Sequence, residues 1–203
     1  MAHFKSRFLT HNWIYNADYY SNVVEGPAVM SAEEISRTIV AKISPKSVID
    51  IGCGTGALLM AFQNLGVLSF GLEYSVEALK FCRSRGVDVQ KFDIEHDFFD
   101  FEKRFDVAIS LEVAEHIPEK YANRYIDLMT KFSDIIIISA ATPGQGGDDH
   151  VNEQPHSYWQ EKFESLGFRL DQSLTEELAT EWGKSGTVTS WYYRNLMIFR
   201  KFG

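Results

Sequence analysis

Cysteine, positive charge and long apolar segments are all scarce in this sequence of 203 residues. Its two cysteines, Cys53 and Cys82, form neither a CxxC pair nor a disulfide framework, which predicts a reducing, cytoplasmic environment. No apolar run reaches the roughly 18 residues that a membrane span needs. The first residues also lack the apolar core of a secretion signal, so we expect no membrane partner.

Basic side chains are outnumbered, with 20 Lys and Arg against 28 Asp and Glu and a net charge of −8. Nucleic-acid binding depends on clustered positive charge, and the sequence has no long basic run. We therefore expect a small-molecule partner and no nucleic acid. With 45% hydrophobic residues, the chain can build the core of a single domain, to which we assign residues 1–203.

The segment VIDIGCGTG at residues 48–56 has the pattern of a buried strand that runs into a glycine turn. Its β-branched residues favour a strand, and glycines at alternate positions let the backbone approach a ligand closely. Apolar residues at helical spacing follow over residues 58–65. Strand, glycine loop and helix together begin a nucleotide-binding βαβ unit.

This turn contains no Lys or Arg, and the lysine of a phosphate-binding loop is absent. Asp50 stands directly before the turn, where a carboxylate repels a pyrophosphate and attracts a cation. Glu73 ends the next predicted strand, 21 residues after Gly52, which is the spacing at which an acid meets ribose hydroxyls. The pattern therefore favours a nucleoside ligand that carries positive charge and no phosphate.

Further elements follow in alternation. A capping box at Ser31 and Glu34 predicts a helix over residues 31–44, and Pro118 is placed as the first residue of a later helix. Another helix is predicted over 158–166, with His156 at its start. The remaining strands are predicted over 67–75, 87–94, 105–110, 134–141, 168–174 and 195–202. Four consecutive isoleucines in 134–141 indicate a strand that is covered on both faces.

Two motifs resemble those of the class I S-adenosylmethionine-dependent methyltransferases. Residues 50–56 match D/E-x-G-x-G-x-G, and residues 112–118 match the run E-V-x-E-H-x-P of the small-molecule branch, which includes ubiquinone and menaquinone biosynthesis enzymes. Residues 150–155 also resemble a run in bacterial members. The resemblance implies a Rossmann-like, doubly wound α/β fold with a seven-stranded, mostly parallel sheet and an antiparallel last strand.

The resemblance also implies a cofactor and its site. The cofactor is S-adenosylmethionine, which leaves as S-adenosylhomocysteine after methyl transfer to a small molecule, with an oxygen acceptor favoured. Glu73 is placed at the ribose, Asp93 at the adenine amino group and Ile94 against the adenine ring. The full set implied to bind the cofactor is Asp50, Gly52, Cys53, Gly54, Glu73, Tyr74, Asp93, Ile94 and Leu111.

The chemistry at the acceptor has three interpretations. His116 or His150 accepts the acceptor's proton, because histidine titrates near neutral pH. Alternatively, both histidines are structural and the enzyme only positions its substrates. In the third, Glu112, Glu115, His116 and His150 bind a divalent metal, a set that resembles the E-x-x-E-H pattern of small-RNA 2′-O-methyltransferases.

Other functions and the domain plan also have alternatives. The chain could be a non-catalytic binding or scaffolding protein of the same fold, an RNA 2′-O-methyltransferase, or an NAD(P)-dependent reductase, for which Tyr158 and Lys162 have the required spacing. Residues 1–44 are predicted as a helical cap and 45–203 as the core. The aromatic residues of segments 1–30 and 176–193 either pack on the domain or form lids; those of 1–30 are Phe4, Phe8, Trp13, Tyr15, Tyr19 and Tyr20.

Overall fold

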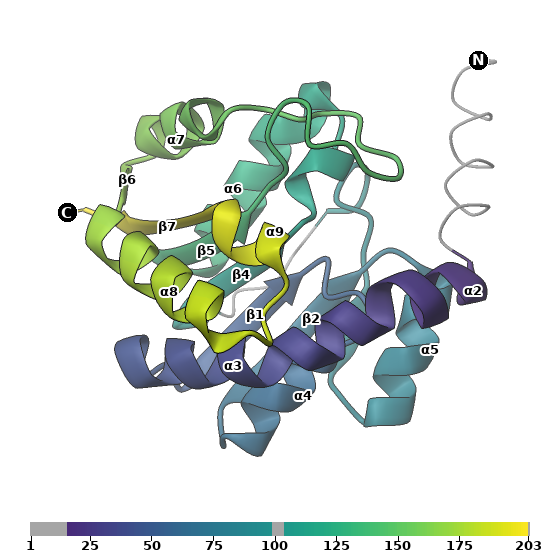
Figure 1. The fold of residues 1–203 in the computed structure, drawn as a ribbon. Coiled ribbons are helices and arrows are strands. Elements are labelled where there is room, and N and C mark those ends of the chain that lie inside the picture. Colours follow the sequence, from purple (N-terminus) through teal and green to yellow (C-terminus); the bar gives the residue numbers. More distant parts are fainter. Residues whose placement is uncertain (1–15, 99–103, 203) are drawn as a thin grey trace, which may run out of the picture.

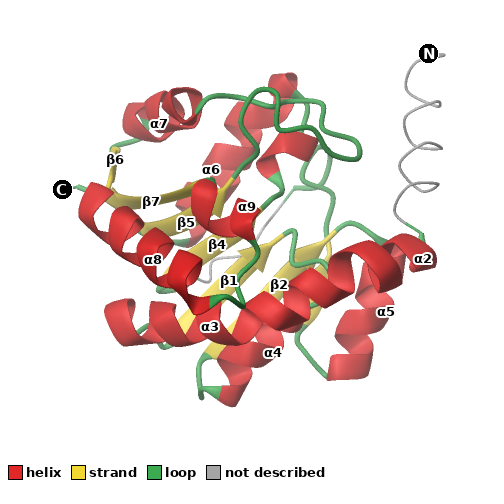
Figure 2. Ribbon diagram, viewed as in Figure 1, coloured by secondary structure: helices red, strands yellow, loops and turns green. Residues whose placement is uncertain are grey.

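A computed structural model describes residues 16–98 and 104–202, which form one seven-stranded sheet between two layers of helices (Figures 1 and 2). The strand order is β3-β2-β1-β4-β5-β7-β6. The strands are β1 (Ser47–Ile51), β2 (Leu68–Glu73), β3 (Val89–Lys91), β4 (Val107–Leu111), β5 (Ile135–Ser139), β6 (Phe168–Leu170) and β7 (Leu196–Lys201). The first five strands pair in parallel, while β7 is antiparallel to both β5 and β6, as predicted for the last strand.

Alternation along the central strands creates two cores. In β5, Ile136 and Ile138 face one core while Ile137 faces the other, so the isoleucine run belongs to a strand covered on both sides. The same alternation holds in β1, where Ile49 and Val48 lie on opposite faces. Such central parallel strands leave only their ends free for a ligand.

The helices cover the two faces of the sheet. Helices α3 (Glu25–Ile43), α4 (Ala57–Asn64) and α8 (Gln172–Ser185) pack on one face, and α6 (Ala122–Phe132) and α7 (His156–Ser165) on the other. α5 (Val76–Arg85) joins α4 through Cys82 and Leu59. The shorter helices are α2 (Ala17–Tyr19), η1 (Tyr20–Val24), η2 (Ala114–His116), η3 (Glu119–Tyr121) and α9 (Ser190–Arg194).

The N-terminal helix is longer than the sequence pattern predicts. α3 begins at Glu25, and Ser31 lies inside it, so the prediction of a cap at Ser31 is wrong. Pro27 lies in the first turn of α3, directly after the π-helical turn η1 that leads into this helix. The Ser31 hydroxyl instead contacts Thr189, accepting a hydrogen bond from its backbone N–H at 3.1 Å. Phe4, Phe8, Trp13 and Tyr15 lie outside the described residues.

Two other predicted boundaries need correction. Pro118 precedes the short helix η3 and is not the first residue of α6. The first part of the segment 176–193 belongs to the structural helix α8, which continues through Gly183 to Ser185.

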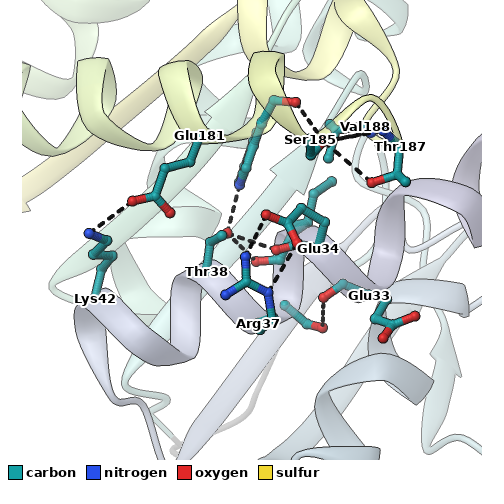
Figure 3. Close-up of polar contacts among 12 residues, drawn as sticks. Glu33, Glu34, Arg37, Thr38, Lys42, Glu181, Ser185, Thr187 and Val188 are labelled. Carbon is teal, nitrogen blue, oxygen red and sulfur yellow. Dashed lines mark hydrogen bonds and ion pairs between the residues drawn. The ribbon is translucent and has the colours of Figure 1, made fainter.

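α8 is held to α3 by apolar and polar contacts (Figure 3). Its residues Leu174, Leu178 and Trp182 are buried against the sheet face that α3 also covers. The indole N–H of Trp182 donates to the Thr38 hydroxyl at 2.7 Å. At the surface of the same interface, the Lys42 ammonium lies 2.9 Å from the Glu181 carboxylate. These contacts place α8 as a structural layer of the domain, with only the following α9 near the site.

Candidate functional site

A cavity of about 690 Å³ opens at the carboxyl ends of the parallel strands. In open α/β sheets this edge is where ligands bind. The cavity is lined by all eleven residues that were predicted for cofactor binding or catalysis: Asp50, Gly52, Cys53, Gly54, Glu73, Tyr74, Asp93, Ile94, Leu111, His116 and His150. Their roles remain predictions. Tyr158 and Lys162, the pair considered for a reductase, are not among the cavity-lining residues.

The glycine loop after β1 presents its backbone to this cavity. Gly52 and Gly54 both have positive φ angles, of 77° and 54°. A Cβ atom at Gly52 would lie 2.5 Å from a Val113 methyl group, so this glycine is required by packing. A Cβ atom at Gly54 would meet only a Val24 methyl group at 3.9 Å, so the space beside Gly54 is open for a ligand.

Glu73 connects the end of β2 to that loop. One carboxylate oxygen accepts a hydrogen bond from the Gly54 N–H at 2.8 Å, and the other accepts from the Ser75 N–H at 2.6 Å. Burial raises the pKa of Glu73 to about 7, although these N–H donors act against the rise. Asp50 also has a pKa raised to about 7, first by burial and then by the charge of Glu73. A cationic ligand would relieve this unfavourable pair of buried acids.

Asp93 is held by the turn that follows β3. Its carboxylate accepts a hydrogen bond from the Glu95 N–H at 2.8 Å and lies 2.9 Å from Nδ1 of His96. The His96 side chain is 44% exposed. The Asp93 carboxylate is therefore fixed in orientation at the cavity rim.

At the other end of the cavity, acids and histidines from two segments meet. Glu115 and His116 lie in η2 after β4, and His150 lies in the loop after β5. One ligand atom from each of the three lies within 4.8 Å of the others. The two imidazole rings have centroids 5.0 Å apart and are almost perpendicular, at 83°. The sequence prediction that both histidines would lie near one sheet edge is confirmed.

Glu115 is the most deeply buried member of this cluster. It is 0% exposed, and neither of its carboxylate oxygens makes a well-aligned hydrogen bond to the described residues, although the backbone N–H groups of Glu115 and Ala141 are near enough to favour its charged form. Burial raises the pKa of Glu115 well above its ordinary range, and the charge of Glu112 adds to the rise. The backbone carbonyl of Glu115 accepts hydrogen bonds from the N–H groups of Val151 and Asn152, both at 3.0 Å. These bonds hold the loop after β5 against η2.

The two histidines are oriented by their Nδ1 atoms. Nδ1 of His116 lies 3.2 Å from the carbonyl oxygen of Asp149, and Nδ1 of His150 lies 2.8 Å from the Glu153 carboxylate. Glu153 in turn accepts hydrogen bonds from the N–H groups of Gly144 and Gly146, at 2.8 and 2.7 Å. The contact with His150 is the largest cause of a lowered Glu153 pKa. In neutral rings held in this way, Nε2 carries the lone pair.

Asn195 was not found from the sequence; it contacts residues of the cavity wall without lining the cavity itself. Asn195 is 2% exposed, and its amide donates to the carboxylate of Glu112 at 3.1 Å and to the side-chain oxygen of Gln145 at 3.0 Å. The signal that could have revealed Asn195 is strand order, because an antiparallel β7 beside β5 begins at the carboxyl edge. Leu196 indeed pairs with Ser139, the last residue of β5.

Aromatic rings from both ends of the chain complete the cavity wall. Tyr19 and Tyr20 contribute from the N-terminal side, and Trp191 and Tyr192 contribute from α9. The pKa of Tyr19 is raised by burial and then by the charges of three acids, among them Asp148. Tyr19 therefore lies near the loop after β5.

The N-terminal segment is anchored beside the glycine loop. The guanidinium of Arg85 pairs with Glu25 at the start of α3 and donates to the Thr55 carbonyl at 3.0 Å.

The described part of the chain contains no helix that is both long and apolar enough to cross a membrane.

Comparison with known proteins places the chain among methyltransferase folds. A family model described as "MetW: Methionine biosynthesis protein MetW" matches residues 33–145. The chain is 32% identical over 88 residues to a ubiquinone biosynthesis O-methyltransferase of Glaesserella parasuis. That match covers 38% of this chain and 37% of the relative, so it spans little more than a third of the curated protein.

Solved structures resemble the chain over most of its length. A sugar N-methyltransferase from Streptoalloteichus aligns with a TM-score of 0.69 and 14% identity, covering 92% of each chain. Magnesium protoporphyrin IX methyltransferase from Synechocystis, with bound S-adenosylhomocysteine, aligns with a TM-score of 0.65 and 17% identity, covering 86% of this chain and 83% of that one. At these identities the likeness shows the fold, and it confirms the predicted fold class.

Proposed function

The chain belongs to the MetW family, since the model of that family matches more than half of its residues, and we propose that it transfers a methyl group from S-adenosylmethionine to a small molecule. The observation that carries this proposal is the open side of Gly54 next to two buried acids. A Cβ at Gly54 would fill space that a ligand can occupy, and neither Asp50 nor Glu73 suits a phosphate. A ligand with a sulfonium, an ammonium and no phosphate fits this surface.

Different residues around the loop would then contact different parts of the cofactor. Asp50 lies at the glycine loop, where its negative charge favours the cationic end of the ligand. Glu73 accepts two backbone hydrogen bonds and can still accept from a ribose diol, because an ionised carboxylate has about four acceptor sites. Asp93 and Ile94 would meet the adenine, with Cys53, Tyr74 and Leu111 completing the wall.

S-adenosylmethionine supplies a methyl group that is already activated, so the protein's tasks are positioning and exclusion of water. In the transfer, an acceptor atom bonds to the methyl carbon as the carbon–sulfur bond breaks, and the electron pair stays on sulfur. The acceptor's proton must leave. The cluster of Glu112, Glu115, His116 and His150 lies at the same cavity and is the group that can promote this loss.

We propose an oxygen atom as the acceptor and a small molecule as its carrier. The name of the Glaesserella parasuis relative, an O-methyltransferase, supports an oxygen. The cavity lies within the range of about 300–1,000 Å³ that small-molecule sites occupy, and the rings of Tyr19, Trp191 and Tyr192 wall it. Such walls favour an acceptor with an apolar or aromatic body and a polar reacting end.

Transfer of label tests the proposal. The full chain is incubated with S-adenosylmethionine labelled on its methyl group and with an extract of small metabolites. We expect labelled metabolites and S-adenosylhomocysteine in equal amounts. Glu73→Gln should raise the KM for S-adenosylmethionine by roughly 10- to 100-fold, because hydrogen bonds to a charged group contribute about 1.5–3 kcal/mol. Product no greater than in a heat-inactivated sample would contradict the proposal.

A further inference from the structure

We propose that Glu115, His116 and His150 bind one divalent first-row transition-metal ion, with Glu112 at the edge of the site. Its part in catalysis, holding and activating the acceptor oxygen, rests on the proposed function; the binding of the ion does not. The site lies at the carboxyl edge of β4 and β5, beside the glycine loop.

The first support is the meeting of three ligand atoms of the right kinds. They lie within 4.8 Å of one another. Tetrahedral ligands at 2.0–2.2 Å from a metal ion are about 3.4 Å apart, so the side chains must move closer by up to about 1.4 Å to complete the arrangement. Two of the three residues come from η2, and the third comes from a loop about 34 residues later in the chain, so the fold brings them together.

The second support is the buried carboxylate of Glu115. With 0% exposure, an ionised Glu115 has lost its water, and the backbone N–H groups of Glu115 and Ala141, which favour the charged form, do not outweigh the effect of burial. An unpaired buried charge is strongly unfavourable, and buried charges are normally paired or bound to a metal. No Lys or Arg of the described chain forms an ion pair with Glu115. A cation in the cavity would supply the missing partner.

The third support is the way in which the imidazoles are held. Metal-binding histidines almost always use their other nitrogen to contact a carboxylate or a backbone carbonyl. Here Nδ1 of His150 contacts the Glu153 carboxylate at 2.8 Å, and Nδ1 of His116 contacts the Asp149 carbonyl at 3.2 Å. When Nδ1 donates in these contacts, each neutral imidazole keeps a lone pair on Nε2 that can bind an ion.

The backbone conformation of the two segments that carry the proposed ligands is also unusual. Glu112 and Asp149 both have φ angles near +55°, a left-handed conformation that is unfavourable for Glu112, whereas aspartate, like asparagine, tolerates it better. Glu112 begins the turn that carries Glu115 and His116, and Asp149 directly precedes His150. Strain of this kind persists where the surrounding structure enforces it, and it gathers at ligand-binding sites.

The chemistry of the ligands selects the ion. Two imidazoles and one or two carboxylates favour Zn²⁺, Fe²⁺, Co²⁺ or Mn²⁺, whereas Mg²⁺ and Ca²⁺ prefer sites made of oxygen atoms alone. Three protein ligands leave coordination positions for an acceptor. An acceptor oxygen bound there would have a lowered pKa, which achieves what a general base would otherwise do. The acceptors best suited have a hydroxyl group, or two adjacent oxygens, at the reacting end.

Cobalt titration tests the site without S-adenosylmethionine. The full chain, treated with a chelator and then freed of it, is titrated with Co²⁺ alone while its visible absorption is followed. We expect one ion per chain in the wild type and in His96→Ala, a matched change of a histidine that lies outside the cluster. His150→Ala, His116→Ala and Glu115→Gln should each weaken binding by about 100-fold or more, and Glu153→Gln by about 10- to 100-fold.

Two further measurements distinguish a loss of metal binding from a loss of folding, and a failure of the metal site from a failure of the proposed function. Thermal unfolding shows which variants are folded; Glu115→Gln preserves shape, and His150→Ala changes only a loop residue, so at least one variant remains informative. S-adenosylhomocysteine binding is titrated on the same samples. If the wild type binds cobalt but does not bind S-adenosylhomocysteine, the proposed function is overturned and the metal site is kept. No cobalt absorption in the wild type, or wild-type affinity in the folded cluster variants, overturns the metal site.

Discussion

At the scale of single residues, a methyl group added at position 54 tests ligand binding, and the same change at another glycine with positive φ controls for backbone strain. Gly54→Ala places a Cβ in the open space of the cavity. We expect it to weaken S-adenosylhomocysteine binding more than tenfold. Gly66→Ala is the matched control, because Gly66 also has a positive φ, of 77°, and nothing lies within 4 Å of its would-be Cβ.

Both variants should lose similar stability, since a left-handed conformation costs a side-chain-bearing residue roughly 1–2 kcal/mol. Calorimetric titration measures binding, and thermal unfolding measures stability. If both alanines bound S-adenosylhomocysteine equally well, the glycine loop would not be the ligand site.

The acids of the site could be predicted because each lies at or within two residues of the carboxyl end of a parallel strand. Asp50, Glu73 and Asp93 follow apolar runs, and topology alone brings such ends to one edge. Asn195 and Gln145 could not be predicted, because their side chains meet Glu112 only through the pairing of β7 with β5. The burial of Glu115 was also hidden, since its sequence neighbours do not show which side chains cover it.

At the scale of elements, α3 and α8 are joined by a buried hydrogen bond and by exposed ion pairs. Removing the buried bond should lower the stability of the protein more than removing the ion pairs. Thr38→Val removes the acceptor of the buried Trp182 N–H (Figure 3). Leaving that donor unpartnered should lower the free energy of unfolding by about 1–3 kcal/mol. Denaturant unfolding measures the change.

Lys42→Met is the matched control at the same interface. It removes exposed ion pairs with Glu177 and Glu181, and exposed pairs contribute little to stability. Neither variant should change S-adenosylhomocysteine binding, because neither residue lines the cavity. An equal loss of stability in both variants would contradict the assigned role of the buried bond.

The strands were easier to predict than the helix boundaries. Residue alternation and the isoleucine run identify β1 and β5, because a strand covered on both sides has few alternatives. The start of α3 was missed because Ser31 and Glu34 form a convincing capping pattern within a helix. Only the tertiary contact of Ser31 with Thr189 explains why a serine lies at that position.

At the scale of the whole molecule, the buried acids predict how stability depends on pH. Asp50 and Glu73 have ordinary pKa values of 3.8 and 4.5, raised in the folded protein to about 7. Between these values the folded state keeps protons that the unfolded chain has released. Their stabilising contribution is therefore complete below about pH 4 and is lost as pH rises through about 7.

We expect the thermal midpoint of the ligand-free protein to be less sensitive to pH between 5 and 8 in Asp50→Asn than in the wild type. His156 acts in the opposite direction, because burial lowers its pKa, so the difference between the two slopes is the informative quantity. Equal slopes in both proteins would show that Asp50 does not titrate in this range.

The overall topology could be predicted because alternating strands and helices restrict the sheet to few arrangements. The cavity's lining could not, since rings from α2, η1 and α9 reach it from opposite ends of the chain. The size of the cavity depends on how these rings pack, which no local pattern records.

The proposed function depends on this cavity binding an S-adenosyl ligand, and calorimetric titration of the full chain with S-adenosylhomocysteine measures that binding. NADPH and ATP serve as comparison ligands, because their phosphates meet two acids and no basic residue in the glycine loop. We expect one S-adenosylhomocysteine per chain with a Kd between about 1 µM and 1 mM, the range typical of enzyme KM values, and no binding of either phosphate ligand. Binding of NADPH or ATP with no binding of S-adenosylhomocysteine would contradict the proposed function.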